Sequence, residues 1–296
     1  MPTPPPSIRM PSFQEQVCNG LSEMQLQFEV TSRGHFSTQI VVSKGNVARL
    51  NIVLITLENW LEAGSFERWQ DEIRTMLVKR EAGLKCVVIW EDYWINNEPI
   101  VKSRVNAMLG NSQKIAARLT QVRRIDQESA ALFLEKNHLN GSVTSKTKYG
   151  LFLPKRYFRV LNEAFEYDHN SEELLVAVAT FSAPRVFARA DGPFRSFEML
   201  RFASLLDTNV SGGLDKLLTA FAREKDPDDI MTYADREWSD GAGYVKLGFE
   251  RISETAPMQF YLSATDMERT SKPDPKRIAI YNAGSIKFVK TYKLPN

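Results

Sequence analysis

The sequence has little of what metal sites, disulfide scaffolds and membrane spans are built from. Of its 296 residues only two are cysteines, Cys18 and Cys86, and three are histidines. Two distant cysteines with no Cys/His cluster argue against a zinc site and are typical of a reducing compartment. No apolar run approaches the length of a membrane-spanning helix. We therefore expect no metal site, no membrane partner, and an intracellular, cytoplasmic location.

The N-terminal residues also lack an apolar segment of the signal-peptide type. Residues 1–14 are rich in proline and contain no acidic side chain. Such a composition predicts a disordered tail. The missing acidic residues leave an organelle-targeting remnant as an alternative, which the scarcity of arginine disfavours.

A strong overall charge is absent as well, since the net charge is +2 and the isoelectric point is near 8.4. A preference for nucleic acid must therefore come from local clusters. No acidic residue lies between Glu98 and Asp126, and a second basic cluster after residue 145 is interleaved with aromatic residues. This mixture suits phosphate contact and base stacking, with a solvated face as the alternative. The candidate nucleic-acid-binding residues are Lys102, Arg104, Lys114, Arg118, Arg123, Arg124, Lys146 and Lys148.

What the sequence does contain is one well-organised stretch, residues 196–252. It begins with an apolar, strand-like segment, continues through Gly212 and Gly213 into a helical pattern, and returns to a strand over 230–235. One apolar helix face is expected from the spacing of Leu214, Leu217, Leu218 and Phe221. The alternation of strands and helices predicts the α/β class.

The glycine turn in this stretch predicts a cradle for an anion. Unpaired N–H groups at a helix start favour negative charge, and glycine lets a phosphate approach the backbone. A tight turn in an ordinary βαβ unit is the alternative. The candidate cofactor-binding residues are Val210, Ser211, Gly212, Gly213, Leu214 and Lys216.

The order strand, glycine turn, helix, strand and Tyr244-Val-Lys-Leu-Gly-Phe249 resembles the GNAT fold of acetyl-CoA-dependent N-acyltransferases, over roughly residues 120–265. The resemblance implies acetyl-CoA as cofactor, with its pyrophosphate on the turn and Tyr244 as the acid that protonates the thiolate. Thr208 or Asn209 stands where the family has Arg or Gln.

Three further residues are candidates for catalysis. Glu198 and Arg201 lie in the central strand, where alternation places them on opposite faces. Asp235, at the end of the next strand, is the expected partner of Arg201. Glu198 or Asp235 would act as base or orienting group, whereas a structural ion pair is the alternative role for the charged residues. His138, at the predicted end of a helix over 126–139, is either a helix cap or a substrate contact.

The preceding part of the chain predicts strands within 24–60, a helix over 66–81, a strand over 84–90 and a helix over 98–110. Together with segments up to residue 262, this order is similar to phage-type homing endonucleases in which a Vsr-like nuclease domain precedes a GNAT-like domain. Thr38 or Gln39 and Asn51 stand where that family has carboxylates, and Glu91 and Asp92 do not rebuild the set. A neutral amide cannot replace a carboxylate on a hard cation. A degenerate nuclease is expected.

We therefore predict a small Vsr-like α/β domain followed by a GNAT-like mixed-sheet α/β domain. The predicted boundaries are a tail over 1–14, the nuclease-like domain over 15–112, the GNAT-like domain over 113–265 and a C-terminal tail over 266–296. Three functions stay open: an acyltransferase-like protein acting on or near nucleic acid, a non-catalytic nucleic-acid-binding subunit of a larger complex, and an active metal-dependent DNA endonuclease.

Overall fold

The computed structural model describes residues 11–163, 165–189 and 192–293. The chain forms two compact units: one contains the residues up to Asn96 together with Phe260–Tyr281, and the other contains Asn97–Gln259 and the residues from Asn282 on. We call them unit 1 and unit 2. This division differs from the predicted one, because the supposed C-terminal tail contributes strands to both units. Most of the predicted N-terminal tail lies outside the described residues, while Ser12 already caps the first helix.

Unit 1 is built on a four-stranded sheet with the order β1-β2-β3-β4, in which only the β3–β4 pair is parallel. Its elements are α1 (Phe13–Glu23), β1 (Gln27–Arg33), β2 (Ser37–Lys44), β3 (Val47–Ile55), α2 (Leu57–Ala63), α3 (Phe66–Glu81), β4 (Lys85–Trp90), the first part of α4 (Glu91–Leu109), β14 (Gln259–Leu262), β15 (Arg269–Thr270) and β16 (Ile278–Tyr281). The predicted helix over 66–81 is confirmed, and Ser65 caps its first turn.

Residues 260–281 are joined to the earlier part of unit 1 by hydrogen bonds and ring packing. Arg269 donates from Nε and Nη2 to the two carboxylate oxygens of Asp92, at 2.9 and 2.8 Å. Trp60 donates its indole N–H to the carbonyl of Ala279 at 2.9 Å. Tyr281 packs with its ring centroid 4.9 Å from that of Phe66. Residues near 270 are thus part of the unit 1 fold.

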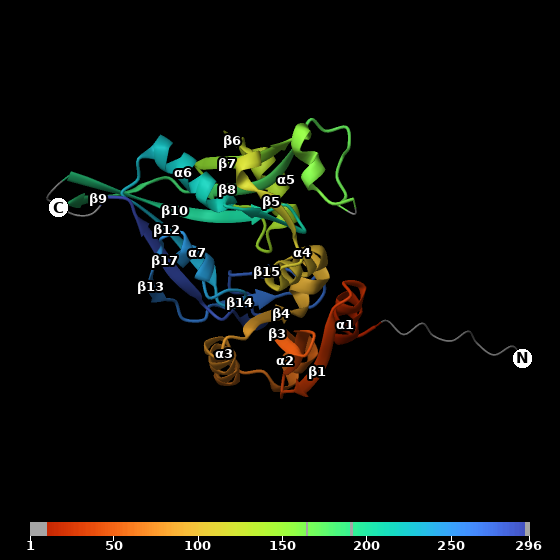
Figure 1. The fold of residues 1–296 in the computed structure, drawn as a ribbon. Helices are drawn as coiled ribbons and strands as arrows, with labels where there is room; N and C mark the ends of the chain where they lie inside the picture. Colours follow the sequence, from red (N-terminus) through yellow and green to blue (C-terminus); the bar gives the residue numbers. More distant parts are fainter. Residues whose placement is uncertain (1–10, 164, 190–191, 294–296) are drawn as a thin grey trace, which may run out of the picture. The chain divides into compact units, whose positions relative to one another are not determined.

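Unit 2 contains an eight-stranded mixed sheet. Seven of its strands have the order β13-β17-β12-β10-β8-β7-β6, and the eighth, β9, pairs with β10. Its elements are the later part of α4, β5 (Gln113–Ala116), a 3-10 turn η1 (Ala117–Leu119), β6 (Gln121–Arg124), α5 (Gln127–Asn137), β7 (Thr147–Pro154), η2 (Lys155–Val160), β8 (Glu173–Phe181), β9 (Arg185–Arg189), β10 (Gly192–Ser204), β11 (Thr208–Ser211), α6 (Gly213–Lys225), β12 (Asp229–Asp235), α7 (Ala242–Lys246), β13 (Glu250–Glu254) and β17 (Ser285–Thr291). Figure 1 shows these elements along the chain. The predicted α/β class is confirmed.

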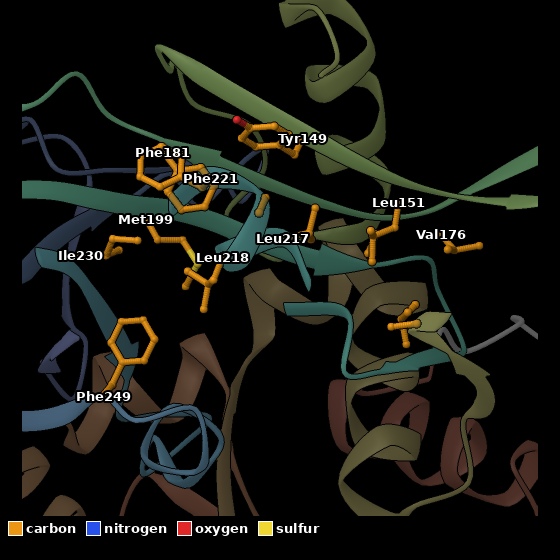
Figure 2. Packing of buried hydrophobic residues seen from close by; sticks show 14 of the residues in the cluster. Tyr149, Leu151, Val176, Phe181, Met199, Leu217, Leu218, Phe221, Ile230 and Phe249 are labelled. Carbon is orange, nitrogen blue, oxygen red and sulfur yellow. The ribbon is translucent and has the colours of Figure 1, made fainter. Parts of the chain in front are cut away.

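The core of unit 2 forms where α6 packs on the sheet (Figure 2). Leu217, Leu218 and Phe221 of α6 are fully buried, as their spacing predicts. The ring of Phe221 stacks on Phe181 of β8, with 4.0 Å between the centroids. This packing holds α6 against β8.

Residues 282–284 (Asn-Ala-Gly) are typical of a hairpin turn, yet the strands on either side of them do not pair with each other. Strand β16, before this turn, belongs to the three-stranded sheet of unit 1, whereas β17, after it, pairs with β12 and β13 of unit 2. Local turn residues suggested pairing between neighbours in sequence, but both strands pair with distant segments.

Candidate functional site

The central feature of unit 2 is the separation of two parallel strands. β10 and β12 pair over only three residue pairs, the last of which joins Glu198 to Met231. Beyond this point β10 continues against β8 up to Ser204, and β12 continues against β17 up to Asp235. The facing edges of β10 and β12 therefore have main-chain groups that do not pair with each other.

A bulge in β10 corrects the predicted placement of Glu198 and Arg201. The pairing of β10 with β8 shifts between Met199 and Arg201, so Leu200 is one residue too many in the strand. An extra residue breaks the two-residue alternation of side chains. Glu198 is consequently close enough for its charge to raise the pKa of Arg201, while burial lowers the pKa of this guanidinium more strongly.

The partners of Arg201 also differ from those expected. Its guanidinium donates to the carbonyls of Gly141 at 3.3 Å and Leu200 at 2.9 Å. Asp235, the predicted partner, accepts the N–H of Glu237 at 2.9 Å. No ion pair between Arg201 and Asp235 occurs among the described residues, so the expected partnership is not formed.

Tyr244 lies where the strands separate. Its ring packs between Phe249 and Phe288, with centroids at 5.6 and 5.5 Å. A hydrogen bond links its hydroxyl to the side chain of Thr232, and burial raises its pKa. Thr232 in turn donates to the carbonyl of Met199, at the bulge of β10, at 3.1 Å. Tyr244 thus keeps its proton at neutral pH beside the bulge.

Three further groups at this site have contacts that the sequence did not predict. His138 lies at the C-terminal end of α5, and its Nδ1 accepts the N–H of Asn140 at 3.1 Å. Arg104, predicted to bind nucleic acid, instead lies over the ring of Trp238, at 4.5 Å from its centroid. Ser182 accepts the N–H of Glu198 at 3.0 Å. The sequence singled out His138 and Arg104 but not the contacts that they make here, and it did not single out Ser182, because these contacts join elements that are distant in the chain.

The environment of His138 makes unit 2 sensitive to acid. Burial and the nearby charges of Arg201 and Arg104 lower its pKa from 6.5 to about 3. Between these values the unfolded chain binds a proton that the folded protein does not, so stability falls as pH decreases from 6.5 toward 3. We expect a loss of about 2 kcal/mol between pH 6.5 and 5, at roughly 1.4 kcal/mol per pH unit. Urea unfolding of unit 2 at both pH values measures it. A His138→Gln variant with the same pH dependence would contradict this assignment.

The glycine turn predicted to be an anion cradle lies between β11 and α6. It does not follow the central strand directly, because β11 pairs with β5 outside the eight-stranded sheet. Gly212 has a φ of 78°, and no side chain caps the helix that follows. A Cβ on Gly213 would lie 2.9 Å from Val210, whereas one on Gly212 would meet only Ala117, at 3.6 Å. Val210 is buried, Leu214 is partly buried and Ser211 is exposed. The first N–H groups of α6 are therefore uncapped beside an open position.

Lys216 does not extend from this turn toward a ligand. Its ammonium donates to the carbonyls of Ala117, at 2.9 Å, and Thr120. Burial lowers its pKa. Lys216 therefore attaches η1 to α6. The turn contacts η1 and β7, a set of elements different from those around Tyr244.

The eight predicted nucleic-acid residues do not form one surface of unpaired charge. Lys102 pairs with Glu98, Arg123 with Glu173, and Arg124 with Glu224. Lys148 donates to the side chain of Gln127 and the carbonyl of Ser145. Lys114, Arg118 and Lys146 are exposed, and no acidic partner occurs for them among the described residues. Pairing thus removes much of the charge that the sequence suggested.

In unit 1 the positions expected for nuclease carboxylates form a buried polar network. Asn51 donates to Gln39 at 2.8 Å, and Gln39 donates to Glu72 at 2.7 Å. Lys79 donates to the amide oxygens of Gln39 and Asn51. Thr38 is buried beside them. Each amide has partners, which is how buried polar groups avoid the cost of desolvation.

The two remaining carboxylates also have structural partners. Glu91 accepts the N–H of Leu57 at 2.6 Å, and Asp92 is held by Arg269. Within residues 11–163, 165–189 and 192–293, no group of three or more His, Cys, Asp or Glu side chains could hold a metal ion.

Comparison with known proteins gives structural neighbours only. No family model and no curated protein matches the chain. A solved structure from Corynebacterium glutamicum, described as a histone acetyltransferase and related acetyltransferase, is 14% identical, covers 60% of this chain and 98% of its own, and has a TM-score of 0.34. NAA60 of Arabidopsis thaliana, in complex with a bisubstrate analogue, is 11% identical, covers 59% of this chain and 99% of its own, and has a TM-score of 0.35. A GNAT family acetyltransferase from Elizabethkingia anophelis with acetyl-CoA bound is 12% identical, covers 58% of this chain and 98% of its own, and has a TM-score of 0.33.

Across the described part of the chain, no helix combines the length and the apolar character that crossing a membrane requires.

Proposed function

We propose that unit 2 is an acetyl-CoA-dependent N-acyltransferase. The observation that carries this proposal is the separation of β10 from β12 beyond Glu198, with the protonated hydroxyl of Tyr244 beside the bulge. An unpaired strand edge can bind a linear ligand that carries amide groups. We propose an amine as acceptor, on a nucleobase or another molecule associated with nucleic acid.

The residues present fit such a cofactor in two places. The N–H groups of Gly213 and Leu214 are uncapped at the start of α6, and the positive φ of Gly212 keeps this turn open. Helix N-termini of this kind favour phosphate groups. The free edge of β10 after Glu198 offers amide partners for the rest of the molecule. Bound acetyl-CoA would supply a thioester activated for acyl transfer.

The side chains around the bulge then have distinct roles. Glu198 would accept a proton from the acceptor amine. Arg201 lies close enough to interact with the charge of Glu198 and would help to position it. Tyr244 would donate its proton to the leaving thiolate, because its raised pKa keeps it protonated. Asp235 would have a positioning role and no part in the reaction. Its carboxylate accepts the N–H of Glu237 and so holds the turn after β12.

Ligand-induced stabilisation tests the cofactor. At a concentration about 100 times the dissociation constant, acetyl-CoA should stabilise unit 2 by about 2.7 kcal/mol. Thermal unfolding in the presence and absence of acetyl-CoA measures this change. An unchanged melting temperature at millimolar ligand would remove the support for an acyltransferase.

Two variants of Gly212 locate the cofactor. Asp and Asn have similar shapes and both tolerate a positive φ, so each should cost the unliganded protein a similar amount, about 1–3 kcal/mol. The φ of 78° at this position makes such a cost unavoidable. Only Gly212→Asp, through charge repulsion, should abolish the response to acetyl-CoA. Equal responses of the two variants would place the phosphates elsewhere.

A second candidate function is nucleic-acid binding as a subunit of a larger complex. Exposed Lys114, Arg118 and Lys146 favour it, since no acidic side chain neutralises them among the described residues. Titration of a labelled oligonucleotide against a Lys114→Glu, Arg118→Glu variant tests this function. We propose no DNA cleavage by unit 1, because Glu91 and Asp92 are held by Leu57 and Arg269.

A further inference from the structure

The hairpin formed by β9 and the first residues of β10 has no role in the proposed acyl transfer. All five residues of β9 are exposed, including Val186 at 60% and Phe187 at 51%. Strand β9 pairs antiparallel with residues 192–196 of β10. In Figure 1 these two strands run out to the left of α6 and the rest of the unit 2 sheet. Large apolar side chains at such an exposed position indicate contact with a partner.

The register of the hairpin sorts its side chains onto two faces. Phe187 lies directly opposite Phe194, and directly opposed residues of an antiparallel pair share a face. Arg185 and Arg189 are each two residues from Phe187 and therefore lie on the same face. The guanidinium of Arg189 covers the ring of Phe194, 3.4 Å from its centroid. One face thus presents two aromatic rings between two arginines.

The two strands of the hairpin are basic. Residues 185–189 and 192–196 contain three arginines, Arg185, Arg189 and Arg195, and no acidic side chain, while the sequence between them contains one, Asp191. Arg195 is anchored at the base of the hairpin, where its backbone N–H donates to Asp228 at 2.5 Å. Arg185 and Arg189 are exposed, and no acidic partner occurs for either in the described part of the chain. These two cations are available to a ligand of opposite charge.

We propose that this face of the β9–β10 hairpin binds single-stranded nucleic acid. An unpaired base can stack on Phe187, because every base has an apolar, polarisable face. Strand geometry places a cation about 7 Å from that ring in each direction along β9. Backbone phosphates on either side of the stacked base then meet Arg185 and Arg189. A duplex does not fit this arrangement, because its bases are paired and stacked on each other.

Fluorescence anisotropy with a labelled oligonucleotide of about 16 nucleotides tests the site. The full chain is titrated with single-stranded DNA, single-stranded RNA and the corresponding duplex. Single strands should bind more tightly than the duplex, with an affinity that falls as salt increases. Phe187→Ala should weaken this binding about tenfold. Arg185→Glu, Arg189→Glu should weaken it further and reduce the slope of log affinity against log salt by about 1.4, or 0.7 for each lost phosphate contact.

The controls separate the hairpin from other basic positions. Arg223→Glu, Lys246→Glu makes the same change in net charge at exposed sites outside the hairpin and should alter the affinity much less. Circular dichroism melting confirms that each variant is folded.

Three results would overturn the proposal: no binding of single strands by the wild type, tighter binding of the duplex, or unchanged affinity in both hairpin variants. Loss of binding only in Lys114→Glu, Arg118→Glu would overturn it too, while supporting the second candidate function. None of these outcomes depends on acetyl-CoA, so the acyltransferase proposal stands or fails separately.

Discussion

Replacing Arg269 with methionine is expected to destabilise unit 1 by about 3–5 kcal/mol, because it leaves a buried carboxylate without its partner. The side chain of Asp92 is only 3% exposed and that of Arg269 only 11%. The guanidinium holds both carboxylate oxygens and also lies over the ring of Tyr93, 4.2 Å from its centroid. Residues 177 positions apart are joined by this pair, so its loss also loosens β15 from the rest of the unit.

Urea unfolding followed by tryptophan fluorescence measures the effect. Four of the five tryptophans, Trp60, Trp69, Trp90 and Trp94, belong to unit 1, so the signal reports this unit. Arg277→Met is the matched control, since its partner Glu268 is 65% exposed and an exposed pair contributes about 0–1 kcal/mol.

A double variant separates the charge from the packing. Asp92→Leu, Arg269→Met removes both charges and should be more stable than Arg269→Met alone, because no buried charge remains unpaired. If Arg269→Met and Arg277→Met cost the same, the pair does not hold unit 1 together.

Replacing Tyr244 with phenylalanine should lower the rate of acyl transfer by about 100- to 10,000-fold, the usual contribution of a general acid. The ring that packs against Phe249 and Phe288 is kept, and only the hydroxyl bonded to Thr232 is lost. The stability cost should therefore be small, about 1 kcal/mol for one hydrogen bond. Because the hydroxyl acts on the leaving group, the KM for acetyl-CoA should change little.

Thiol release from acetyl-CoA, measured with the best acceptor from a panel of amines, gives these constants. Tyr233→Phe is a close control: the residue belongs to neighbouring β12, and its side chain is 40% exposed. Its loss of a hydroxyl should leave the rate unchanged. A Tyr244→Phe enzyme as fast as this control would exclude Tyr244 as the acid and leave the thiolate to be protonated by solvent.

Several local features were predictable because their causes are local. The helix over 66–81 follows from its apolar spacing, and the structure has α3 over the same residues. The buried face of α6 follows in the same way from Leu217, Leu218 and Phe221. Both depend on a helical period, which can be recognised in the sequence of the helix without knowing which segments it contacts.

Features that depend on distant segments were not predictable. The bulge at Leu200 changes which side of β10 carries Arg201, and it arises from pairing with β8 rather than from the residues of β10 alone. The basic clusters in the sequence overstated the unpaired charge. Arg123 and Arg124 are neutralised by Glu173 and Glu224, which lie 50 and 100 residues away in the chain. An ion pair requires two charged residues to lie close together in space, and the sequence does not show which distant residues meet.

By itself, then, the sequence determined the α/β class, the glycine turn before α6 and the helix that carries Tyr244, since periodicity and backbone freedom act within a few residues. Tertiary structure alone decided that residues 260–281 complete unit 1 while β17 completes unit 2, and that His138 and Thr232 lie with Arg201 and Tyr244. Strand pairing and burial decide such contacts, because both depend on how segments far apart in the chain meet in the folded protein.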